Sequence, residues 1–291
     1  MTSPSMTGKT CLITGATAGI GLATAAALAR QGATVVGVGR NAAKCAGVQA
    51  RLRQETGNPA VEYLTADLAS LAEVRRLAAE FTAAYPRLDV LVNNVGAFFM
   101  GRRLNADGIE MTWALNYLGV CLLTDELLPL LKASAPARIV NVASDMHRSA
   151  RLNFDDLQGA RKFSGMKAYG QSKLAMVIWT YDLARRLAGT GVTANVVHPG
   201  FVASDLYRTS FGGKKWLAAL IKLMALSNEK GAATSVYLAS SPEVEGVTGQ
   251  YFTKQQAVRS SSASYDLAAT GRLMEITAGM IRSCVPEVTS R

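Results

Sequence analysis

The sequence predicts an α/β fold, a doubly wound parallel sheet with helices on both faces, and two observations support this prediction. Short strand-like runs alternate with helical runs between Thr10 and Val197, which is the pattern of repeated strand–helix–strand units. The strand-like runs are also apolar on both faces, as strands buried between two helix layers are. The chain has 26 glycines and only 8 prolines, which suits tight turns between strands and helices.

The expected strands are short apolar runs, at Thr10–Thr14, Ala33–Gly39, Val61–Thr65, Val90–Asn93, Ala137–Ala143 and Thr193–Val197. The expected helices fill the intervals between them, at Ile20–Gln31, after Gly39 through about Arg53, and at Leu71–Tyr85, Ile109–Leu131 and Ala168–Gly189. No linker, repeat or low-complexity segment interrupts this order, so we expect residues 1–291 to form a single domain. Residues 201–230 are expected to form a segment that covers the substrate.

Composition and charge exclude several classes of protein. The apolar fraction of 49% allows a sizeable core, and the formal net charge is +10. A charge of this sign could attract nucleic acid, an acidic membrane or an anionic cofactor. The basic residues, however, occur in short scattered groups and form no nucleic-acid motif, so we expect a basic soluble surface and no nucleic-acid partner.

The cysteines and histidines form no metal or disulfide pattern. Four cysteines are widely spaced without a Cys-x-x-Cys, and the chain has two histidines, so we expect neither a metal site nor a disulfide framework. This usage fits a reducing, cytoplasmic setting. The short polar N-terminus predicts no signal peptide or anchor, and no stretch is expected to reach the ~20 apolar residues that span a bilayer.

A glycine-rich turn, Thr14–Gly21, joins the first strand to the first helix. Glycines there permit a tight turn and close approach of the backbone to a pyrophosphate, and the helix N-terminus offers N–H groups to phosphate. The spacing is Gly-x-x-x-Gly-x-Gly, and its place between strand and helix predicts nucleotide binding. The residues expected at the cofactor here are Gly15, Thr17, Gly19, Ile20 and Gly21.

The end of the second strand predicts which cofactor is bound. The strand ends at Arg40-Asn41, Lys44 lies one helical turn beyond Arg40, and no acidic residue occurs between Gly32 and Gln54. A carboxylate here would accept from the ribose of NAD, whereas a guanidinium can clamp the 2′-phosphate of NADP. We therefore expect NADP, with NADPH preferred over NADH; the alternative is that Arg40 merely faces solvent.

Two further strand ends carry candidate cofactor residues. Asp67-Leu68 follows the third strand and could border the adenine, and Asn94-Val95-Gly96 follows Asn93 at the end of the fourth. Side-chain amides at that position could fix the loop beneath the cofactor. Ordinary turn chemistry is the alternative for both, since Asn, Asp and Gly form turns in any case.

Tyr169 and Lys173 are the most informative pair in the chain. Their i, i+4 spacing places both side chains on one helix face. The pKa of a tyrosine is ordinarily about 10, and a fixed neighbouring cation lowers it, which makes the phenol a plausible acid/base group near neutral pH. Taken alone, such a pair is usually a surface pair, so it gains meaning only from the other motifs.

These motifs together resemble the short-chain dehydrogenase/reductase family. The resemblance extends from Thr14-Gly15 to about Phe252 and includes the glycine turn, Asp67, the Asn-Asn-x-Gly element and Pro199-Gly200. It implies a Rossmann-like fold and a nicotinamide cofactor that carries the hydride. The catalytic set that it implies is Asn116, Ser144, Tyr169 and Lys173. It also places Tyr169, Lys173, Pro199, Gly200, Val202 and Ser204 at the cofactor.

Each implied catalytic role has a physical reason. The Ser144 hydroxyl can hold a carbonyl oxygen as its negative charge develops, and Tyr169 exchanges the proton with that oxygen. The resemblance implies that Lys173 lowers the pKa of Tyr169 and bonds the nicotinamide ribose. It also implies that Asn116 bends its helix and holds a water that relays protons to Lys173; the alternative is a buried structural asparagine, which needs a polar partner.

One departure from the commonest family pattern points to a branch. Tyr169 follows Ser144 by 25 positions (169 − 144), and the added segment contains Phe154-Asp155-Asp156-Leu157. This segment, with Gln171-Ser172, resembles the retinol dehydrogenase-like branch, and protochlorophyllide reductase relatives have comparable features. The resemblance implies lipophilic aldehyde, ketone or alcohol substrates.

The expected substrate wall comes from loops at the carboxyl ends of the strands. These loops are apolar and aromatic, as suits an oily substrate, and the candidate substrate residues are Phe98, Phe99, Met146, His147, Tyr207 and Phe211. For His147 the favoured alternative is a loop histidine that bonds its neighbours. Segment Lys214–Leu226 is basic and apolar; we expect a lid helix over the pocket, with contact to a membrane surface as the alternative.

The leading hypothesis is an NADP(H)-dependent carbonyl reductase or alcohol dehydrogenase acting on a small hydrophobic substrate. A non-redox relative, such as an epimerase or dehydratase, is one alternative. A non-catalytic NADP-binding sensor is another, although all four catalytic positions are filled. Family members are often dimers or tetramers, so a homo-oligomer is possible.

Overall fold

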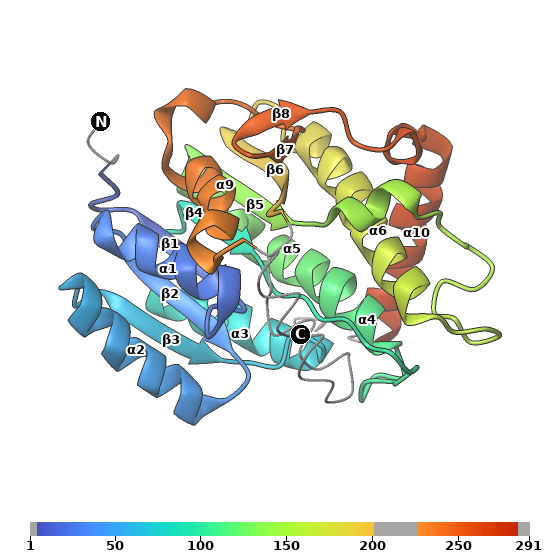
Figure 1. The fold of residues 1–291 in the computed structure, drawn as a ribbon, viewed down its shortest axis with the longest axis horizontal. Helices are drawn as coiled ribbons and strands as arrows, with labels where there is room; N and C mark the ends of the chain where they lie inside the picture. Colours follow the sequence, from blue (N-terminus) through green and yellow to red (C-terminus); the bar gives the residue numbers. More distant parts are fainter. Residues whose placement is uncertain (1–4, 201–225, 285–291) are drawn as a thin grey trace, which may run out of the picture.

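An eight-stranded sheet forms the centre of the protein (Figure 1). The computed structural model describes residues 5–200 and 226–284. The strand order is β3-β2-β1-β4-β5-β6-β7-β8; every neighbouring pair is parallel except β7 with β8. The strands are β1 Thr10–Thr14, β2 Thr34–Gly39, β3 Val61–Thr65, β4 Val90–Asn93, β5 Ala137–Val142, β6 Val192–His198, β7 Tyr251–Thr253 and β8 Gln256–Val258.

Helices cover both faces of this sheet, so the predicted doubly wound architecture is confirmed (Figure 1). One layer contains α1 Gly19–Arg30, α2 Ala42–Thr56 and α9 Asn228–Ser240. The other contains α3 Leu71–Ala84, α4 Met111–Trp113, α5 Gly119–Ala133, α6 Gly165–Arg186 and, packed on α6, α10 Leu267–Cys284. A separate apolar core lies between the sheet and each layer.

The helix ends follow local chemistry. Asn41 Oδ1 accepts the Lys44 amide at 2.8 Å and caps α2, and Ser70 Oγ accepts the Glu73 amide and caps α3. Such caps satisfy N–H groups that have no partner inside the helix. At the other end of α2, Gly57 has φ +67°, a left-handed conformation that glycine adopts without a Cβ clash.

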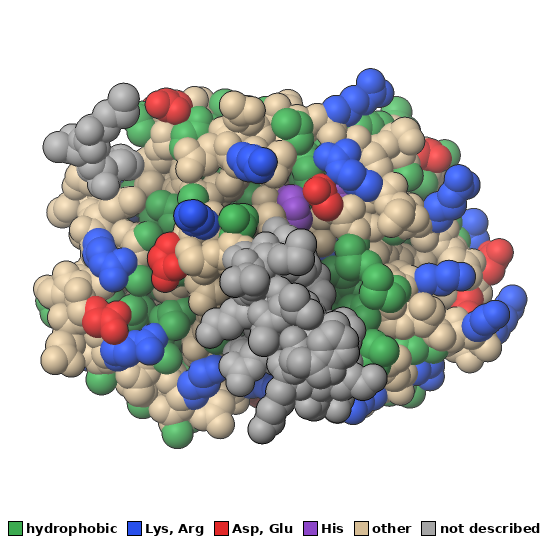
Figure 2. All heavy atoms as spheres, viewed as in Figure 1, with side chains coloured by type: hydrophobic (Ala, Val, Ile, Leu, Met, Phe, Trp, Pro, Cys, Tyr) green, Lys and Arg blue, Asp and Glu red, His purple; other side chains and the backbone are tan. Residues whose placement is uncertain are grey.

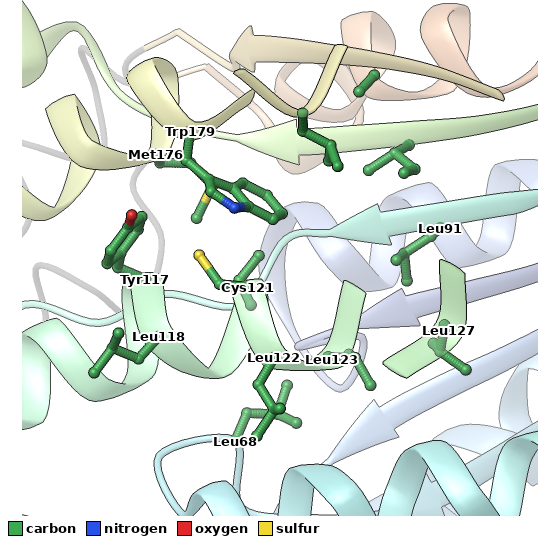
Figure 3. Packing of buried hydrophobic residues seen from close by; sticks show 14 of the residues in the cluster. Leu68, Leu91, Tyr117, Leu118, Cys121, Leu122, Leu123, Leu127, Met176 and Trp179 are labelled. Atoms are coloured by element: carbon green, nitrogen blue, oxygen red, sulfur yellow. The ribbon is translucent and has the colours of Figure 1, made fainter. Parts of the chain in front are cut away.

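The larger core packs α5 and α6 against the sheet. Trp179 and Met176 of α6 point toward Cys121 of α5 and toward Tyr117, which precedes it (Figure 3). These four side chains are at most 2% exposed. This packing fixes α6, the helix that carries Tyr169 and Lys173, relative to the strand ends.

The structure adds elements that the sequence pattern did not indicate. The expected helix Ile109–Leu131 is instead α4, a π-helical segment Ala114–Leu118, and α5, in direct succession. Strands β7 and β8, and helices α9 and α10, were not expected. Residues 201–225, most of the segment expected to cover the substrate, lie outside the described residues.

The sequence predicted no stretch long and apolar enough to span a bilayer, but one helix meets that test by length and composition. The continuous helix Met111–Ala133 has 23 residues and is apolar enough to cross a bilayer. However, 67% of its most apolar window is buried inside the protein, where α5 packs against α3 and against β4 and β5 of the sheet. A buried core helix passes the same test, so the finding is weak evidence for a membrane span.

A buried carboxylate, Asp89, lies at the amino-terminal ends of the central strands β1 and β4. Asp89, which is 2% exposed, accepts hydrogen bonds from Lys9 Nζ (3.0 Å), Arg87 Nε (2.7 Å) and the Thr10 amide (2.9 Å). Burial alone would raise the pKa of this carboxyl, but the bonds from Arg87, Thr10 and Lys9 together hold it below its ordinary value. Asp89 therefore stabilises the fold as a carboxylate.

We predict that Asp89→Asn lowers the free energy of unfolding at neutral pH by about 1–3 kcal/mol, because buried donors lose their charged acceptor. The folded pKa lies below the unfolded value, so this stabilisation is present above an unfolded pKa of about 3.9 and is lost as pH falls through the lower folded pKa. Urea unfolding across this range should show the two proteins converging in acid. Glu73→Gln, at an exposed ion pair with Arg76, is the control; equal losses in both variants would contradict the assignment.

Candidate active site

The glycine-rich turn after β1 is built for close approach. Gly15 and Gly19 have φ values of +65° and +57°. A Cβ on Gly21 would lie 2.4 Å from both Asn94 Nδ2 and the Gly15 oxygen. Asn94 Nδ2 in turn donates to the Thr14 oxygen at 2.9 Å and to the Gly15 oxygen at 3.3 Å. Asn94 thus supports this turn from the end of β4.

The start of α1 suits an anion. Among the described residues no side chain caps this helix at Ala18, and its first turn has no acidic residue. The N–H groups and positive dipole end therefore face the turn without a competing carboxylate. The glycine cradle and the helix start together fit a dinucleotide pyrophosphate. Gly15, Thr17, Gly19, Ile20 and Gly21 all lie in this turn or in the first turn of α1, and their contact with a cofactor stays a prediction.

The end of β2 lies directly against this turn. A Cβ on Gly39 would come 2.4 Å from Thr17 Cγ2, so the strand end and the turn touch because Gly39 lacks a side chain. Arg40 and Lys44 follow and are exposed. The Asn41 side chain caps α2, so its oxygen is engaged by the backbone.

Asp67 and Leu68 take different positions at the end of β3. The exposed Asp67 accepts the Ala69 amide at 3.0 Å, which is the turn chemistry left open as the alternative. Leu68 is 4% exposed and belongs to the larger core. A Cβ on Gly119 would lie 2.1 Å from the Leu68 oxygen, so this loop is seated on α5.

Lys173 is the most buried cation of the candidate site. Its side chain is 3% exposed, and Nζ donates to the Val142 oxygen at 2.9 Å and lies 5.8 Å from the centroid of the Tyr169 ring. A Cβ on Gly96 would lie 3.2 Å from Nζ and 3.5 Å from Asn116 Oδ1. Burial lowers the pKa of Lys173 to about 8, because the charged form loses its hydration.

Asn116 lies in the π-helical segment and is fully buried. Its Oδ1 accepts the Ala97 amide at 2.8 Å, and its Nδ2 donates to the Ala97 oxygen at 2.9 Å and to Ser172 Oγ at 3.3 Å. A π-bulge is a local widening found often at functional sites. The side chain therefore holds the loop after β4 and reaches α6; the water relay to Lys173 stays a prediction.

Ser144 and Tyr169 lie at the same end of the sheet. Ser144 follows β5, is partly exposed, and its Oγ accepts the Met146 amide at 3.3 Å at the start of the 3-10 turn Asp145–Ser149. Tyr169 is 7% exposed, and its ring meets the Phe98 ring edge-on at 5.8 Å between centroids. Lys173 bonds the last residue of β5, two positions before Ser144, so these residues lie where the end of β5 meets α6, with the Phe98 ring against Tyr169.

The remaining predicted residues are distributed as follows. Phe98 and Phe99 are partly buried and Met146 lies beside Ser144. Val95 packs against the larger core, and Pro199 and Gly200 follow β6. Val202, Ser204, Tyr207 and Phe211 lie outside the described residues.

The assignment of His147 to the substrate wall is wrong. Its ring is 0% exposed, Nδ1 bonds the backbone carbonyl oxygen of Ser144 at 2.8 Å, and Nε2 accepts a hydrogen bond from the Ser261 amide at 3.2 Å. A buried ring with both nitrogens engaged has no surface to offer a substrate. The alternative, a histidine that bonds its neighbours, agrees with these contacts.

Sequence reasoning gave no role to two residues between Tyr169 and Lys173. Ser172 Oγ donates to the backbone carbonyl oxygen of Tyr169 at 2.8 Å and accepts from Asn116 Nδ2. Gln171 accepts the Asn153 amide and donates to the Leu157 oxygen, both at 2.7 Å, and so holds the inserted segment on α6. Their sequence signals were their place between the two candidate catalytic residues and their part in the resemblance to the retinol dehydrogenase-like branch, and neither signal indicated these contacts.

Comparison with known proteins gives consistent results. Residues 9–214 match the family described as short chain dehydrogenase. Retinol dehydrogenase 14 from Homo sapiens is 42% identical over 299 residues, covering 95% of this chain and 87% of that protein. Polyprenol dehydrogenase from Homo sapiens is 42% identical over 265 residues, covering 89% and 80%.

Solved structures agree in fold. A Pseudomonas aeruginosa RhlG/NADP active-site complex superposes with a TM-score of 0.71 at 30% identity, covering 91% of this chain and 100% of that one. A Mycobacterium paratuberculosis protein superposes with a TM-score of 0.78 at 30% identity, covering 96% of each chain. The chain therefore belongs to the short-chain dehydrogenase family of oxidoreductases, in its retinol dehydrogenase-like branch.

Proposed function

We propose that the protein is an NADP(H)-dependent carbonyl reductase or alcohol dehydrogenase for small hydrophobic substrates. The observation that carries this proposal is the buried Lys173 ammonium, 5.8 Å from the Tyr169 ring and next to the strand end that bears Ser144. This arrangement would place the proton-transfer group, the Tyr169 hydroxyl, near the Ser144 hydroxyl that would bind the substrate oxygen. The cytoplasmic location expected from the sequence stays a prediction.

The residues at the nucleotide end fit a nicotinamide dinucleotide, which supplies or accepts the hydride when bound. Gly15, Gly21 and the start of α1 would hold its pyrophosphate. Arg40 and Lys44 are exposed beside this turn with no acidic residue near them in sequence, which supports a 2′-phosphate and hence NADP. The solved Pseudomonas aeruginosa RhlG/NADP complex supports the same choice.

The chain's own groups account for the proton transfer. The Ser144 hydroxyl would bond the substrate oxygen and share its developing negative charge. The Tyr169 hydroxyl would donate its proton to that oxygen in reduction and accept one in oxidation. The Lys173 ammonium would stabilise the phenolate that remains. Substrate and cofactor would be held in reacting geometry by the strand ends.

A hydrophobic substrate is supported by two features. The Phe98 ring lies against Tyr169 and Phe99 follows it in the same loop, and apolar walls with few polar groups favour apolar ligands. The relatives with retinol and polyprenol in their names are named for apolar alcohols. No nucleic-acid partner is proposed, since basic and acidic side chains are interspersed over the face in Figure 2.

We predict that Tyr169→Phe lowers kcat by at least about 100-fold, since a positioned acid/base group contributes this much or more. NADPH binding should change little. The measurement is NADPH oxidation with a panel of hydrophobic aldehydes and ketones, alongside a fluorescence titration of NADPH. Tyr237→Phe, whose hydroxyl bonds Glu243 beside α9, is the matched control. Full activity in Tyr169→Phe would refute the mechanism.

The lowered pKa of Lys173, about 8, predicts that carbonyl reduction slows as pH rises through that value, because the ammonium is lost. The appropriate measure is kcat/KM at limiting cofactor, which reports ionisations of the free enzyme. Between the folded pKa and an unfolded value of about 10.4 the unfolded chain binds more protons, so the free energy of unfolding should rise with pH there. Lys173→Met should lack this rise. A pH–rate profile flat from about pH 6 to pH 9 would contradict the role assigned to Lys173.

For the cofactor, we predict that Arg40→Asp lowers the ratio of kcat/KM with NADPH to that with NADH by at least about tenfold, because charge-assisted bonds to phosphate are replaced by repulsion. Steady-state kinetics with both cofactors gives this ratio. Arg51→Asp, at an exposed ion pair with Glu55 on the same helix α2, is the charge-matched control. A ratio equal to that of the unmodified protein would exclude Arg40 as the phosphate ligand.

A further inference from the structure

The 3-10 turn Asp145–Ser149 is held from two sides. On one side it lies on α6, since a Cβ on Gly170 would be 3.2 Å from the Met146 oxygen and 3.3 Å from Ala150 Cβ. Gly170 directly follows Tyr169. On the other side the turn is bonded through His147. The position of Ser144 relative to Tyr169 therefore depends on how this turn is seated.

His147 bonds the carbonyl of Ser144 twice. Its own amide donates to the Ser144 oxygen at 3.1 Å, and Nδ1 lies 2.8 Å from the same oxygen. Nε2 accepts the Ser261 amide at 3.2 Å. A backbone amide is always the donor, so Nε2 must present its lone pair and Nδ1 must carry the proton. The Ser261 contact thus selects the tautomer that can donate to Ser144.

The surroundings of the ring keep it in this place. The ring is fully buried and lies 4.9 Å from the Tyr251 ring, centroid to centroid. The Tyr251 hydroxyl donates to Asp145 Oδ1 at 2.9 Å, so β7 holds the residue next to Ser144 as well. Burial lowers the pKa of His147 and keeps the ring neutral, as the acceptor at Nε2 requires.

We propose that His147 is a positioning residue for catalysis: its Nδ1–H fixes the Ser144 carbonyl, and its Nε2 ties the serine to the loop that begins at Ser261. This inference rests on the proposed role of Ser144 in holding the substrate oxygen. His147 itself touches neither substrate nor cofactor. A small displacement of the Ser144 hydroxyl would move it out of line with the Tyr169 hydroxyl, and catalytic rates are sensitive to such shifts.

Two substitutions separate the hydrogen bond from the packing. His147→Phe keeps a ring of similar volume against Tyr251 but has no donor. His147→Asn places an amide nitrogen near the former Nδ1 and restores a donor to the Ser144 oxygen. We expect His147→Phe to lower kcat roughly 10–100-fold with NADPH binding unchanged, and His147→Asn to recover most of this loss.

The kinetic results have clear opposite outcomes. A kcat in His147→Phe within about twofold of the unmodified protein would overturn the proposal, as would an equal loss in both variants. Thermal unfolding shows whether each variant is folded. If His147→Phe does not fold, Ser261→Pro removes the amide donor while leaving His147 intact; φ at Ser261 is −67°, which proline accepts. Ser261→Pro should then show the loss of kcat, and a normal kcat would overturn the proposal.

The tautomer gives a readout that needs no turnover. Long-range ¹H–¹⁵N spectra of the two histidines at neutral pH should show one ring protonated at Nδ1 and bare at Nε2, and this signal should be absent from His147→Asn. The His147 ring is identified by the signal that His147→Asn lacks, and protonation of that ring at Nε2 would overturn the proposal even in an active enzyme. Conversely, an unmodified protein that reduces no carbonyl would refute the proposed function while leaving the tautomer measurable.

Discussion

The hydrogen bond from the Lys173 ammonium to the Val142 carbonyl is the interaction on which the candidate site depends. A cation so deeply buried is costly unless polar groups surround it, and here β5, the loop after β4 and the π-helical segment all approach it. Gly96 makes the approach possible, because a side chain there would crowd both Nζ and Asn116. The surrounding elements bury Lys173, which lowers its pKa. The same packing fixes β5, the loop after β4 and the π-helical segment relative to α6.

The carboxyl-terminal half of α6 is held in place by buried hydrogen bonds. A ladder of buried polar side chains crosses the core: Asn141 donates to Thr180 at 2.9 Å, and Asn93 donates to Asn141 at 2.9 Å and to Thr124 at 3.0 Å. Buried side-chain networks of this kind favour one arrangement of their elements, although Asn93 Oδ1 has no partner among the described residues. With the apolar packing of Trp179 and Met176 around it (Figure 3), α6 is fixed in rotation, so Tyr169 and Lys173 face the strand ends.

Much of this arrangement could be predicted from sequence, and the reasons for the failures are physical. The six expected strands are apolar runs long enough to be recognised, and helical spacing paired Tyr169 with Lys173. Strands β7 and β8 have three residues each, and their turn places Lys254 and Gln255 at φ +50° and +63° without the glycine or asparagine that marks such turns. The π-helical segment was not predicted, because apolar periodicity shows that a helix exists but not where one extra residue is inserted into it.

The surroundings of Ser144 escaped for a different reason, which is chain separation. The bond from Ser261 to His147 spans 114 residues, that from Arg148 to the Arg259 oxygen spans 111, and that from Tyr251 to Asp145 spans 106. No local pattern marks such partners. Loop-closure entropy grows only slowly with length, so contacts this distant are tolerated once the sheet has brought β5, β6 and β7 side by side. A serine that looks like the end of one strand is thus positioned by the last third of the chain, which is why a motif could identify the residue but not the contacts that hold it.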